Sequence, residues 1–280
     1  MCRIVARLGC VPAHSADLLR GRCGLVAQSV ADPGRLQQDE WGVGLWRGER
    51  WFVEKSERPI FRDQAVVDHI ADIRVPAVLA HIRQASNPSG APRYRLLRPV
   101  NSQPFQDGRW LFAHNGTLFI VQEALTALGR DRWLVQGEND SEVFFRLLMR
   151  CLIEDTQHDP ARAIPAAIRW IWRMWRECYR RYPKLSAPCS LLNMVLTEGE
   201  RLWACCYDAR PRKRWVRALC VQSTPFAQMV FRVERRSLTV ASEPTDASPA
   251  WQPLPHGSLL IAARSSRRVA WSIRSLGVLY

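Results

Sequence analysis

The second residue of the chain is the first that could carry out chemistry. Cys2 follows Met1, and an initiator methionine before a small side chain is normally removed, which would make this cysteine the amino terminus. A free α-amine has a pKa of roughly 7.7 to 8, so a terminal cysteine carries both a nucleophile and a base that can accept its proton. Unrelated proteins also have cysteine second by chance, so Cys2 alone does not define an enzyme.

Five further short motifs follow Cys2-Arg3-Ile4 in the first half of the chain. They are Asp39-Glu40-Trp41-Gly42-Val43-Gly44, His81-Ile82-Arg83-Gln84-Ala85-Ser86, Asn101-Ser102-Gln103-Pro104-Phe105, His114-Asn115-Gly116 and Asn139-Asp140-Ser141-Glu142. Each motif is short, but their order together with Cys2 resembles the glutaminase domain of class II glutamine amidotransferases. The resemblance covers positions 2–142, about half of the chain.

The resemblance implies roles for several polar residues. The arginine that matches Arg83 grips the substrate α-carboxylate, which suits a planar guanidinium, and the aspartate that matches Asp140 holds the substrate ammonium. The side-chain amide of Asn115 and the backbone N–H of Gly116 would form the oxyanion hole. Ser86 is a further candidate contact to the α-carboxylate, with a purely structural hydroxyl as the alternative.

The same residues also have plainer interpretations. Arg83 could form a surface salt bridge at a strand end, and Asp140 could be the N-cap of a helix. Asn115-Gly116 could simply make a turn after a strand. His81 and His114 are interpreted as structural, because the α-amine of an N-terminal cysteine already serves as the base.

The sequence departs from the family pattern at several positions. Glu40 stands where glycine is usual in Asp-Gly-Trp, and Gln103 replaces a frequent histidine before Pro-Phe. Gln84 and Asn87 replace residues found in amidotransferases that pass ammonia to a fused synthase. These departures leave the hydrolytic centre intact, but they put ammonia channelling and the details of the entrance loops in doubt.

Hydrophobic periodicity predicts the elements that must position these residues. Strands are predicted over 3–8, 41–47, 51–55, 77–82 and 110–113, and helices over 16–19, 24–31, 63–73, from 140 onward and over 165–182. A long loop is predicted over 87–104. Short strands are predicted over 191–197, 201–207, 215–222, 229–233, 238–241, 258–262 and 269–273. Strands, then helices, then strands again favour a layered α+β fold with antiparallel sheets.

The resemblance makes this fold prediction more specific. It implies the four-layer αββα sandwich of N-terminal-nucleophile (Ntn) hydrolases. We expect one glutamine amidotransferase type 2 domain over 1–280, with its core motifs in 2–142 and its carboxy-terminal strands completing the sheets. Ser242-Glu243-Pro244 weakly resembles a late segment of the stand-alone members, and Glu243 could be purely structural.

The bulk composition indicates a globular, enzyme-sized protein, with 280 residues of which 47% are hydrophobic. The nine cysteines are an odd number without a C-x-x-C pair, which predicts a reducing compartment and no structural zinc. The eight cysteines other than Cys2 are interpreted as small buried hydrophobic residues. No segment resembles a signal peptide or approaches the ~18 apolar residues of a membrane span, so a cytoplasmic location is expected. No cofactor and no metal are expected.

Arginine carries the excess positive charge. The formal net charge is +14, and lysine occurs only three times. A nucleic-acid partner is not expected, because no zinc-finger, RNP-like or basic-leucine pattern accompanies the charge. One face of the predicted helix 165–182 is lined by Arg169, Arg173, Arg176 and Arg180. We interpret this face as solvated, with a docking surface for an acidic partner or a second subunit as the alternative.

Three functions remain open at this point. The first is an amidohydrolase that cleaves the γ-glutamyl amide of glutamine or a γ-glutamyl compound through a thioester on Cys2. The second is a glutaminase subunit that supplies ammonia to a separate synthase. The third is a non-catalytic basic binding protein on the same fold. The intact set of Cys2, Arg83, Asn115, Gly116 and Asp140 counts against it. Nothing after Ala241 resembles a synthase domain, so a fused ammonia acceptor is not expected and a small γ-glutamyl substrate is the predicted partner.

Overall fold

A computed structural model of the chain describes residues 2–32, 36–84, 90, 92–209, 215–216, 219–220, 224–225, 228–277 and 279. A seven-stranded antiparallel sheet has the order β13-β11-β12-β1-β4-β2-β3. Its strands are β1 (Arg3–Ala13), β2 (Glu40–Trp46), β3 (Trp51–Ser56), β4 (Val75–Arg83), β11 (Met229–Val233), β12 (Ser237–Ala241) and β13 (Gln252–Leu254). We call this sheet the first sheet.

A six-stranded antiparallel sheet, the second sheet, has the order β15-β14-β8-β7-β6-β5. Its strands are β5 (Phe105–Asp107), β6 (Trp110–Leu118), β7 (Cys189–Thr197), β8 (Arg201–Cys206), β14 (Ser258–Arg264) and β15 (Val269–Ser275). A separate short pair is made by β9 (Trp215–Val216) and β10 (Thr224–Pro225).

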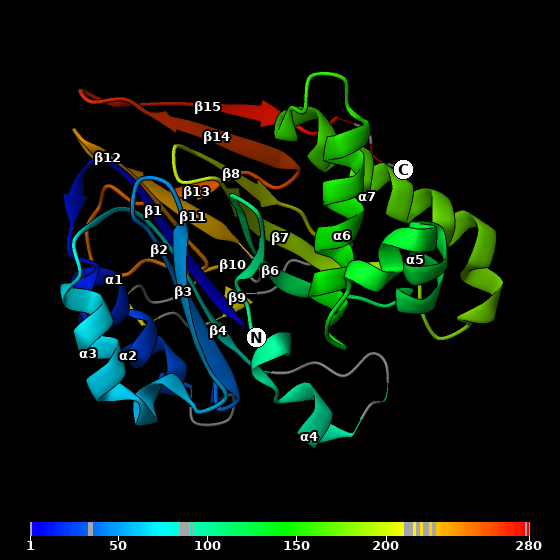
Figure 1. The fold of residues 1–280 in the computed structure, drawn as a ribbon, viewed down its shortest axis with the longest axis horizontal. Coiled ribbons are helices and arrows are strands. Elements are labelled where there is room, and N and C mark those ends of the chain that lie inside the picture. Colours follow the sequence, from blue (N-terminus) through cyan, green and yellow to red (C-terminus); the bar gives the residue numbers. More distant parts are fainter. Residues whose placement is uncertain are drawn as a thin grey trace.

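Helices cover the outer face of each sheet. The α-helices are α1 (Ala16–Leu19), α2 (Leu25–Val30), α3 (Gln64–Asp72), α4 (Arg93–Leu96), α5 (Val121–Leu128), α6 (Asp140–Glu154) and α7 (Pro160–Cys178). Short 3₁₀ helices lie at Ile60–Arg62, Pro99–Asn101, Gly129–Leu134 and Tyr179–Arg181. Figure 1 shows α1, α2 and α3 against the first sheet, and α5, α6 and α7 against the second.

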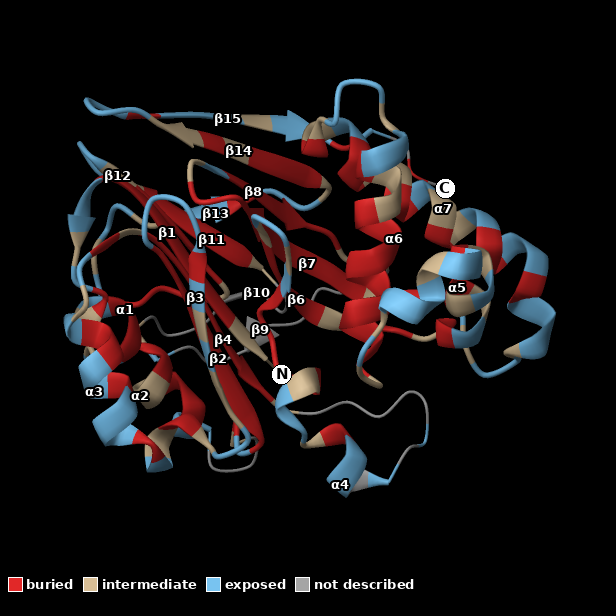
Figure 2. Cartoon of the chain, in the orientation of Figure 1, coloured by how far each residue is buried: buried red, intermediate tan, exposed pale blue. Residues whose placement is uncertain are grey.

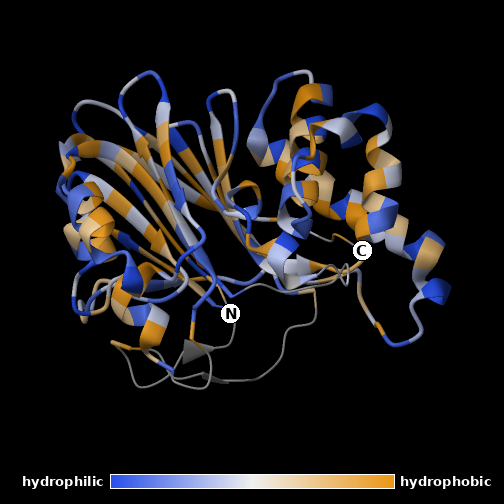
Figure 3. Cartoon of the chain, turned by 60° about the horizontal axis from the view of Figure 1, so that its bottom comes forward, coloured by the Kyte–Doolittle hydropathy of each residue, from blue (hydrophilic) through white to orange (hydrophobic). Residues whose placement is uncertain are grey.

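Three apolar clusters hold these layers together. One lies between the two sheets, one between the first sheet and α1 to α3, and one between the second sheet and α5 to α7. The buried residues therefore run through the middle of the molecule, and the helices are exposed on their outer sides (Figure 2). Figure 3 shows the same division in hydropathy, with apolar residues on the helix faces that meet the sheets. The predicted αββα sandwich is confirmed.

Side-chain alternation along the strands decides which residues face the other sheet. In β1, Ile4 and Ala6 belong to the cluster between the sheets, whereas Val5 belongs to the cluster under α1 to α3. In β6, Ala113 faces the first sheet, whereas Phe112 packs against the helices on the outer side. Residues two apart on a strand share a face, so the polar residues at the ends of these strands fall on predictable sides.

Several element boundaries differ from the predicted ones. The helix α5 was not predicted, and the expected loop 87–104 contains α4 and a 3₁₀ helix. The helix α7 begins at Pro160 rather than at Pro165, because the Asp159 side chain caps it by accepting a hydrogen bond from the backbone N–H of Ala161. A proline is well tolerated at the first position of a helix, so Pro160 marks the start and Pro165 lies inside.

The arginine-bearing face of α7 lies on the outside of the molecule. Arg169, Arg173 and Arg176 are exposed. Ile168 and Ile171, on the opposite face, are buried in the apolar cluster between the second sheet and α5 to α7. The predicted amphipathic division of this helix is therefore confirmed. Together with Arg150 and Cys151 of α6, among other residues, these arginines line an open pocket of about 630 Å³.

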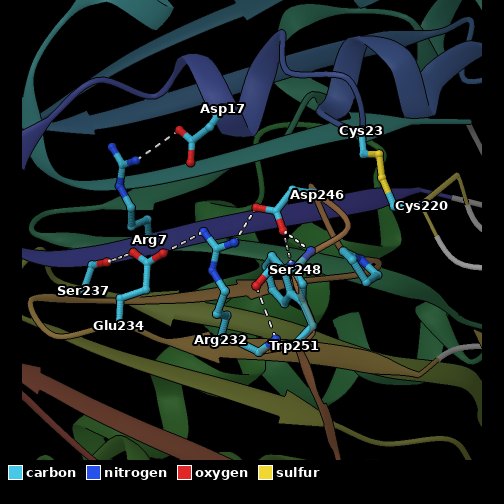
Figure 4. Close-up of polar contacts among 12 residues, drawn as sticks. Arg7, Asp17, Cys23, Cys220, Arg232, Glu234, Ser237, Asp246, Ser248 and Trp251 are labelled. Carbon is cyan, nitrogen blue, oxygen red and sulfur yellow. Dashed lines mark hydrogen bonds and ion pairs between the residues drawn. A yellow bond between two sulfur atoms is a disulfide. The ribbon is translucent and has the colours of Figure 1, made fainter.

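One cysteine pair departs from the expectation that eight cysteines are simply buried hydrophobic residues. Cys23 and Cys220 form a disulfide whose Cα atoms lie 6.1 Å apart (Figure 4). Because the two cysteines are 197 positions apart, no local spacing in the sequence could indicate the pair. Five of the free cysteines other than Cys2 are buried as expected, and Cys151 is partly exposed.

A polar network holds the segment that follows β12. The Arg232 guanidinium on β11 forms ion pairs with Asp246 and, at 3.0 Å, with Glu234. Trp251 donates from Nε1 to Asp246 Oδ1 at 2.9 Å, so strand and segment are tied together (Figure 4).

None of the described helices is long and apolar enough to cross a membrane.

Candidate active site

The start of β1 brings Cys2 into the space between the two sheets. Arg3 pairs with Ile82 across the strands, so Cys2 lies beside the Arg83 end of β4. From the second sheet, Asn115 Nδ2 donates a hydrogen bond of 2.8 Å to the Cys2 carbonyl oxygen. The Cys2 thiol lies 3.7 Å from the carbonyl oxygen of Gln84, which accepts its weak hydrogen bond. The predicted nucleophile and the predicted oxyanion-hole residue are thus in direct contact.

The electrostatic surroundings of Cys2 favour the neutral thiol. Burial raises its pKa above the ordinary value, the nearby Arg83 charge lowers it and the Asp140 carboxylate raises it. A thiol in this setting needs a base to become a nucleophile. The same interactions place Cys2, Arg83 and Asp140 within electrostatic reach of one another.

Arg83 lies at the end of β4 and is buried, with 3% of its surface exposed. Its Nη1 forms an ion pair with Glu40 and donates to the carbonyl oxygens of Leu96 at 3.2 Å and Asn101 at 3.5 Å. The alternative of a surface salt bridge is therefore wrong, because both partners of the pair are buried.

Asp140 occupies the first turn of α6, but it is not the N-cap. The cap is Asn139, whose Oδ1 accepts from the Ser141 backbone N–H at 2.9 Å. Asp140 instead reaches β6, where its Oδ2 accepts from the Leu118 backbone N–H at 2.7 Å. Burial raises its pKa to about 6, against the opposing effects of this hydrogen bond and of the Arg83 charge.

Asn115 and Gly116 lie inside β6, so the alternative of a turn after the strand is wrong. Asn115 is opposite Asn193 and Gly116 is opposite Leu192 on β7, and the strand continues to Leu118. A Cβ atom on Gly116 would lie 1.9 Å from the backbone oxygen of Leu191. The close approach of β7 therefore requires glycine here, whatever further role its N–H has.

The two histidines beside these residues are buried and neutral at neutral pH. His114 contacts Ser141 Oγ at 2.9 Å and the Leu191 carbonyl oxygen at 3.1 Å, and burial lowers its pKa to about 4. For His81, burial and then the Arg83 charge lower the pKa to about 3. Both observations support the structural interpretation of these histidines.

Two residues of the Asn101–Phe105 motif have roles that the sequence did not indicate. Asn101 Oδ1 accepts from the Glu138 backbone N–H at 2.6 Å, and its carbonyl oxygen accepts from Asn139 Nδ2 at 2.7 Å. Because the same carbonyl oxygen also accepts from Arg83, Asn101 links the arginine to the start of α6. Gln103 forms a reciprocal pair with the His114 backbone, at 3.0 Å and 2.5 Å, and so supports β6 next to Asn115.

The late segment 242–243 fixes the start of β1. The Ile4 backbone N–H donates to Ser242 Oγ at 3.0 Å, and the Ser242 N–H donates to the Ile4 carbonyl oxygen at 2.9 Å. Arg3 forms an ion pair with the buried Glu243. Glu243 is thus a positioning residue for the strand that carries Cys2, and the weak Ser242-Glu243-Pro244 motif was its only signal in the sequence.

Ser86, predicted to contact the α-carboxylate, and Met1, predicted to be removed, lie outside the described residues. Within the part of the chain that the structure describes, no group of three or more His, Cys, Asp or Glu side chains could hold a metal ion.

Known proteins share both the sequence pattern and the fold. The family model of the class-II glutamine amidotransferases matches residues 24–274. A gamma-glutamyl-hercynylcysteine sulfoxide hydrolase of Mycolicibacterium smegmatis is 28% identical over 269 residues, which cover 93% of this chain and 95% of the relative. The protein of the same name from Mycobacterium tuberculosis H37Rv is 34% identical over 136 residues, which cover 46% of this chain and 53% of the relative.

Two solved structures show the same arrangement of layers. A glutamine aminotransferase class-II domain protein from Silicibacter pomeroyi superposes with a TM-score of 0.65 at 19% identity, covering 99% of this chain and 100% of the other. The glutamine phosphoribosylpyrophosphate amidotransferase of B. subtilis superposes with a TM-score of 0.63 at 13% identity, covering 99% of this chain and 50% of the other. With the match of the family model over most of its length, the chain belongs to the class-II glutamine amidotransferases.

Proposed function

We propose that this protein hydrolyses the γ-glutamyl amide of a small γ-glutamyl compound, with Cys2 as the nucleophile after removal of Met1. The observation that carries the proposal is the meeting of Cys2 with Asn115 between the two sheets, within electrostatic reach of Arg83 and Asp140. The two mycobacterial relatives are named as hydrolases of a γ-glutamyl compound, which supports the same class of substrate.

The geometry suggests how the reaction would proceed. The Cys2 sulfur attacks the carbonyl carbon of the scissile amide, while the α-amine accepts the thiol proton and then gives it to the leaving nitrogen. The amide C–N bond breaks and leaves a thioester on Cys2, which water hydrolyses to release glutamate. Asn115 Nδ2 has two hydrogens, of which one is bonded to the Cys2 carbonyl oxygen, so the other can meet the tetrahedral oxygen together with the Gly116 N–H.

Two charged residues would recognise the amino-acid end of the substrate. The buried Asp140 carboxylate lies at the start of α6 and suits the substrate ammonium. The Arg83 guanidinium suits the α-carboxylate, since its Nη1 is engaged inside the protein and its other edge has no hydrogen-bond partner among the described residues. A screen of γ-glutamyl compounds for released glutamate tests the proposal directly, and no release from any of them would refute it.

The Asn115→Ala variant tests the oxyanion assignment. We expect kcat to fall by roughly 10² to 10³ with little change in KM, because an oxyanion donor acts mainly in the transition state. Steady-state kinetics on the best γ-glutamyl substrate measure both constants. A rise in KM at unchanged kcat would contradict the assignment and leave Asn115 as a support for Cys2 alone.

The alternative of a glutaminase subunit makes a different prediction for the isolated protein. A hydrolase turns over without a partner, whereas an ammonia-supplying subunit is nearly silent until its synthase is added. We favour the hydrolase, because the alignment with the Mycolicibacterium smegmatis relative covers 95% of that protein, which is named as a hydrolase. A cytoplasmic location stays a prediction, and the Cys23–Cys220 disulfide is unusual for that compartment.

The exposed arginines of α7 allow a test of the non-catalytic alternative. We expect no sub-micromolar binding of short single-stranded or duplex DNA at physiological salt, because the charge lies on a solvated helix face without a base-reading motif. Fluorescence anisotropy across a salt series measures this. Tight binding with a steep salt slope, removed by Arg173→Glu with Arg176→Glu, would favour a basic binding protein instead.

A further inference from the structure

Glu40 lies directly opposite Arg83 across the β2 and β4 strands. Both side chains face the space between the sheets, and the exposed fractions of their side chains are 0% for Glu40 and 4% for Arg83. The two form an ion pair through Glu40 Oε1 and Arg83 Nη1. The pair is thus buried in the place where the proposed function requires Arg83 to meet the substrate.

The pair uses up one edge of the guanidinium. An arginine Nη1 has two hydrogens. Here they are shared among three acceptors, which are the Glu40 carboxylate and the carbonyl oxygens of Leu96 and Asn101. An approaching carboxylate can therefore use only the edge formed by Nε and Nη2. The end-on fork that joins Nη1 and Nη2 is closed to it.

The charge of Arg83 is also largely compensated before any substrate arrives. Burial raises the pKa of the Glu40 carboxyl, and the Arg83 charge opposes this effect, so the ionised Glu40 depends on its arginine. Lys55 on β3 is a second cation within electrostatic reach of Glu40, and Asp39 is a further anion. The second oxygen of Glu40, Oε2, is buried, and the nearby Ser102 hydroxyl also lowers the pKa of the Glu40 carboxyl.

We propose that Glu40 is a specificity-determining residue that competes with the α-carboxylate of the substrate for the Arg83 guanidinium. This inference rests on the proposed function and deepens it. When the α-carboxylate enters, two carboxylates share one guanidinium, and such like-charge juxtaposition is costly in a buried site. The selectivity of the site for a γ-glutamyl group over an acyl group that lacks the carboxylate is therefore lower than Arg83 alone would give.

The test compares two substrates that differ only in the α-carboxylate. They are the p-nitroanilides of L-γ-glutamate and of 4-aminobutanoate, which share the scissile amide and the amine that Asp140 would hold. In Glu40→Gln the negative charge is removed while the size of the side chain and one acceptor oxygen are kept. We expect KM for the γ-glutamyl substrate to fall by about tenfold or more, with kcat little changed. KM for the 4-aminobutanoyl substrate should stay within about twofold, because it has no carboxylate to compete.

A matched control variant makes the result specific. Glu142→Gln removes another buried carboxylate, which accepts from the backbone N–H groups of Gln136 and Gly137 and makes no contact with Arg83. In this variant the ratio of the two KM values should match that of the unmodified protein. If Glu40→Gln does not fold, Glu40→Gly replaces it, and protection from thermal unfolding by L-glutamate relative to 4-aminobutanoate should increase.

The possible outcomes separate the inference from the function on which it rests. A Glu40→Gln variant with an unchanged ratio of KM values, or with both KM values raised, would overturn the inference and make Glu40 a residue that only positions Arg83. Failure of the unmodified protein to hydrolyse any γ-glutamyl compound would instead overturn the proposed function. A selective fall in KM for the γ-glutamyl substrate supports both.

Discussion

Replacement of Cys2 by alanine will abolish turnover of γ-glutamyl substrates and leave the fold nearly as stable as before. The Cys2 side chain is only partly buried, and its thiol makes one weak hydrogen bond of 3.7 Å to Gln84. Loss of such a contact should change the free energy of unfolding by about 1 kcal/mol or less. The backbone contact from Asn115 to the Cys2 carbonyl oxygen does not depend on the side chain, so the site should keep its shape. Released glutamate and thermal melting measure the two effects.

The same mechanism requires Cys2 to be the first residue of the active protein. Because the proposed base is the α-amine of Cys2, a retained Met1 would convert that amine into a peptide nitrogen and remove the base. Intact-mass measurement of an active preparation should therefore give a chain that begins at Cys2. Full activity in a preparation that retains Met1 quantitatively would refute the N-terminal-nucleophile mechanism, and so would substantial turnover by the alanine variant.

The sequence predicted the parts of the site that depend on strands. The alternation in β1 and β6 places Cys2 and Asn115 on facing sides of the two sheets. Strands were expected over 3–8 and 110–113, next to these two residues but without them. The helix that begins at Asp140 was likewise predicted from its apolar spacing. The spacing of the apolar residues and the order of the motifs were enough to predict these elements. Strand alternation then fixes the side of the sheet on which each residue lies.

The remaining parts depend on contacts between distant segments, which one sequence does not reveal. The Glu40 carboxylate was recognised only as a departure from glycine, and its pairing with Arg83 follows from the register of β2 and β4. Asn101 joins Arg83 to the start of α6 through backbone groups, which leave no pattern in side-chain types. Glu243 contacts the start of β1 across 240 positions, so no local spacing could predict it.

The Glu40 pair also affects how Arg83 should be tested. In Arg83→Ala the buried Glu40 would lose its partner, and an unpaired buried charge costs about 3 to 5 kcal/mol of stability. A loss of activity in that variant would therefore mix misfolding with lost substrate binding. Arg83→Lys keeps the charge beside Glu40 but loses the planar fork, so it separates recognition of the carboxylate from stability.

Asp140→Asn is the cleaner test of amino-acid recognition, and we expect it to lower kcat/KM by roughly two to three decades. Asparagine has nearly the same shape, and its oxygen can still accept the Leu118 N–H that now bonds to Asp140 Oδ2 at 2.7 Å. What disappears is the negative charge that would hold the substrate ammonium. Removing one partner of such a buried charge pair costs about 2 to 5 kcal/mol.

The pH dependence of this variant decides between a functional and a structural role of Asp140. Because burial raises the folded-state pKa of Asp140 from 3.8 to about 6, kcat/KM of the unmodified protein should fall as the pH drops below about 6. That step near pH 6 should be absent in Asp140→Asn, which should keep only the fall caused by protonation of the Cys2 α-amine, whose pKa is roughly 7.7 to 8. The raised pKa means that protonated Asp140 favours the folded state: its contribution to stability is fully present below pH 3.8 and is lost as the pH rises through about 6. At pH 7 to 8 the variant should therefore be at least as stable as the unmodified protein. Brisk hydrolysis of N-acetylated γ-glutamyl substrates, or a step near pH 6 that persists in Asp140→Asn, would remove Asp140 from the substrate site.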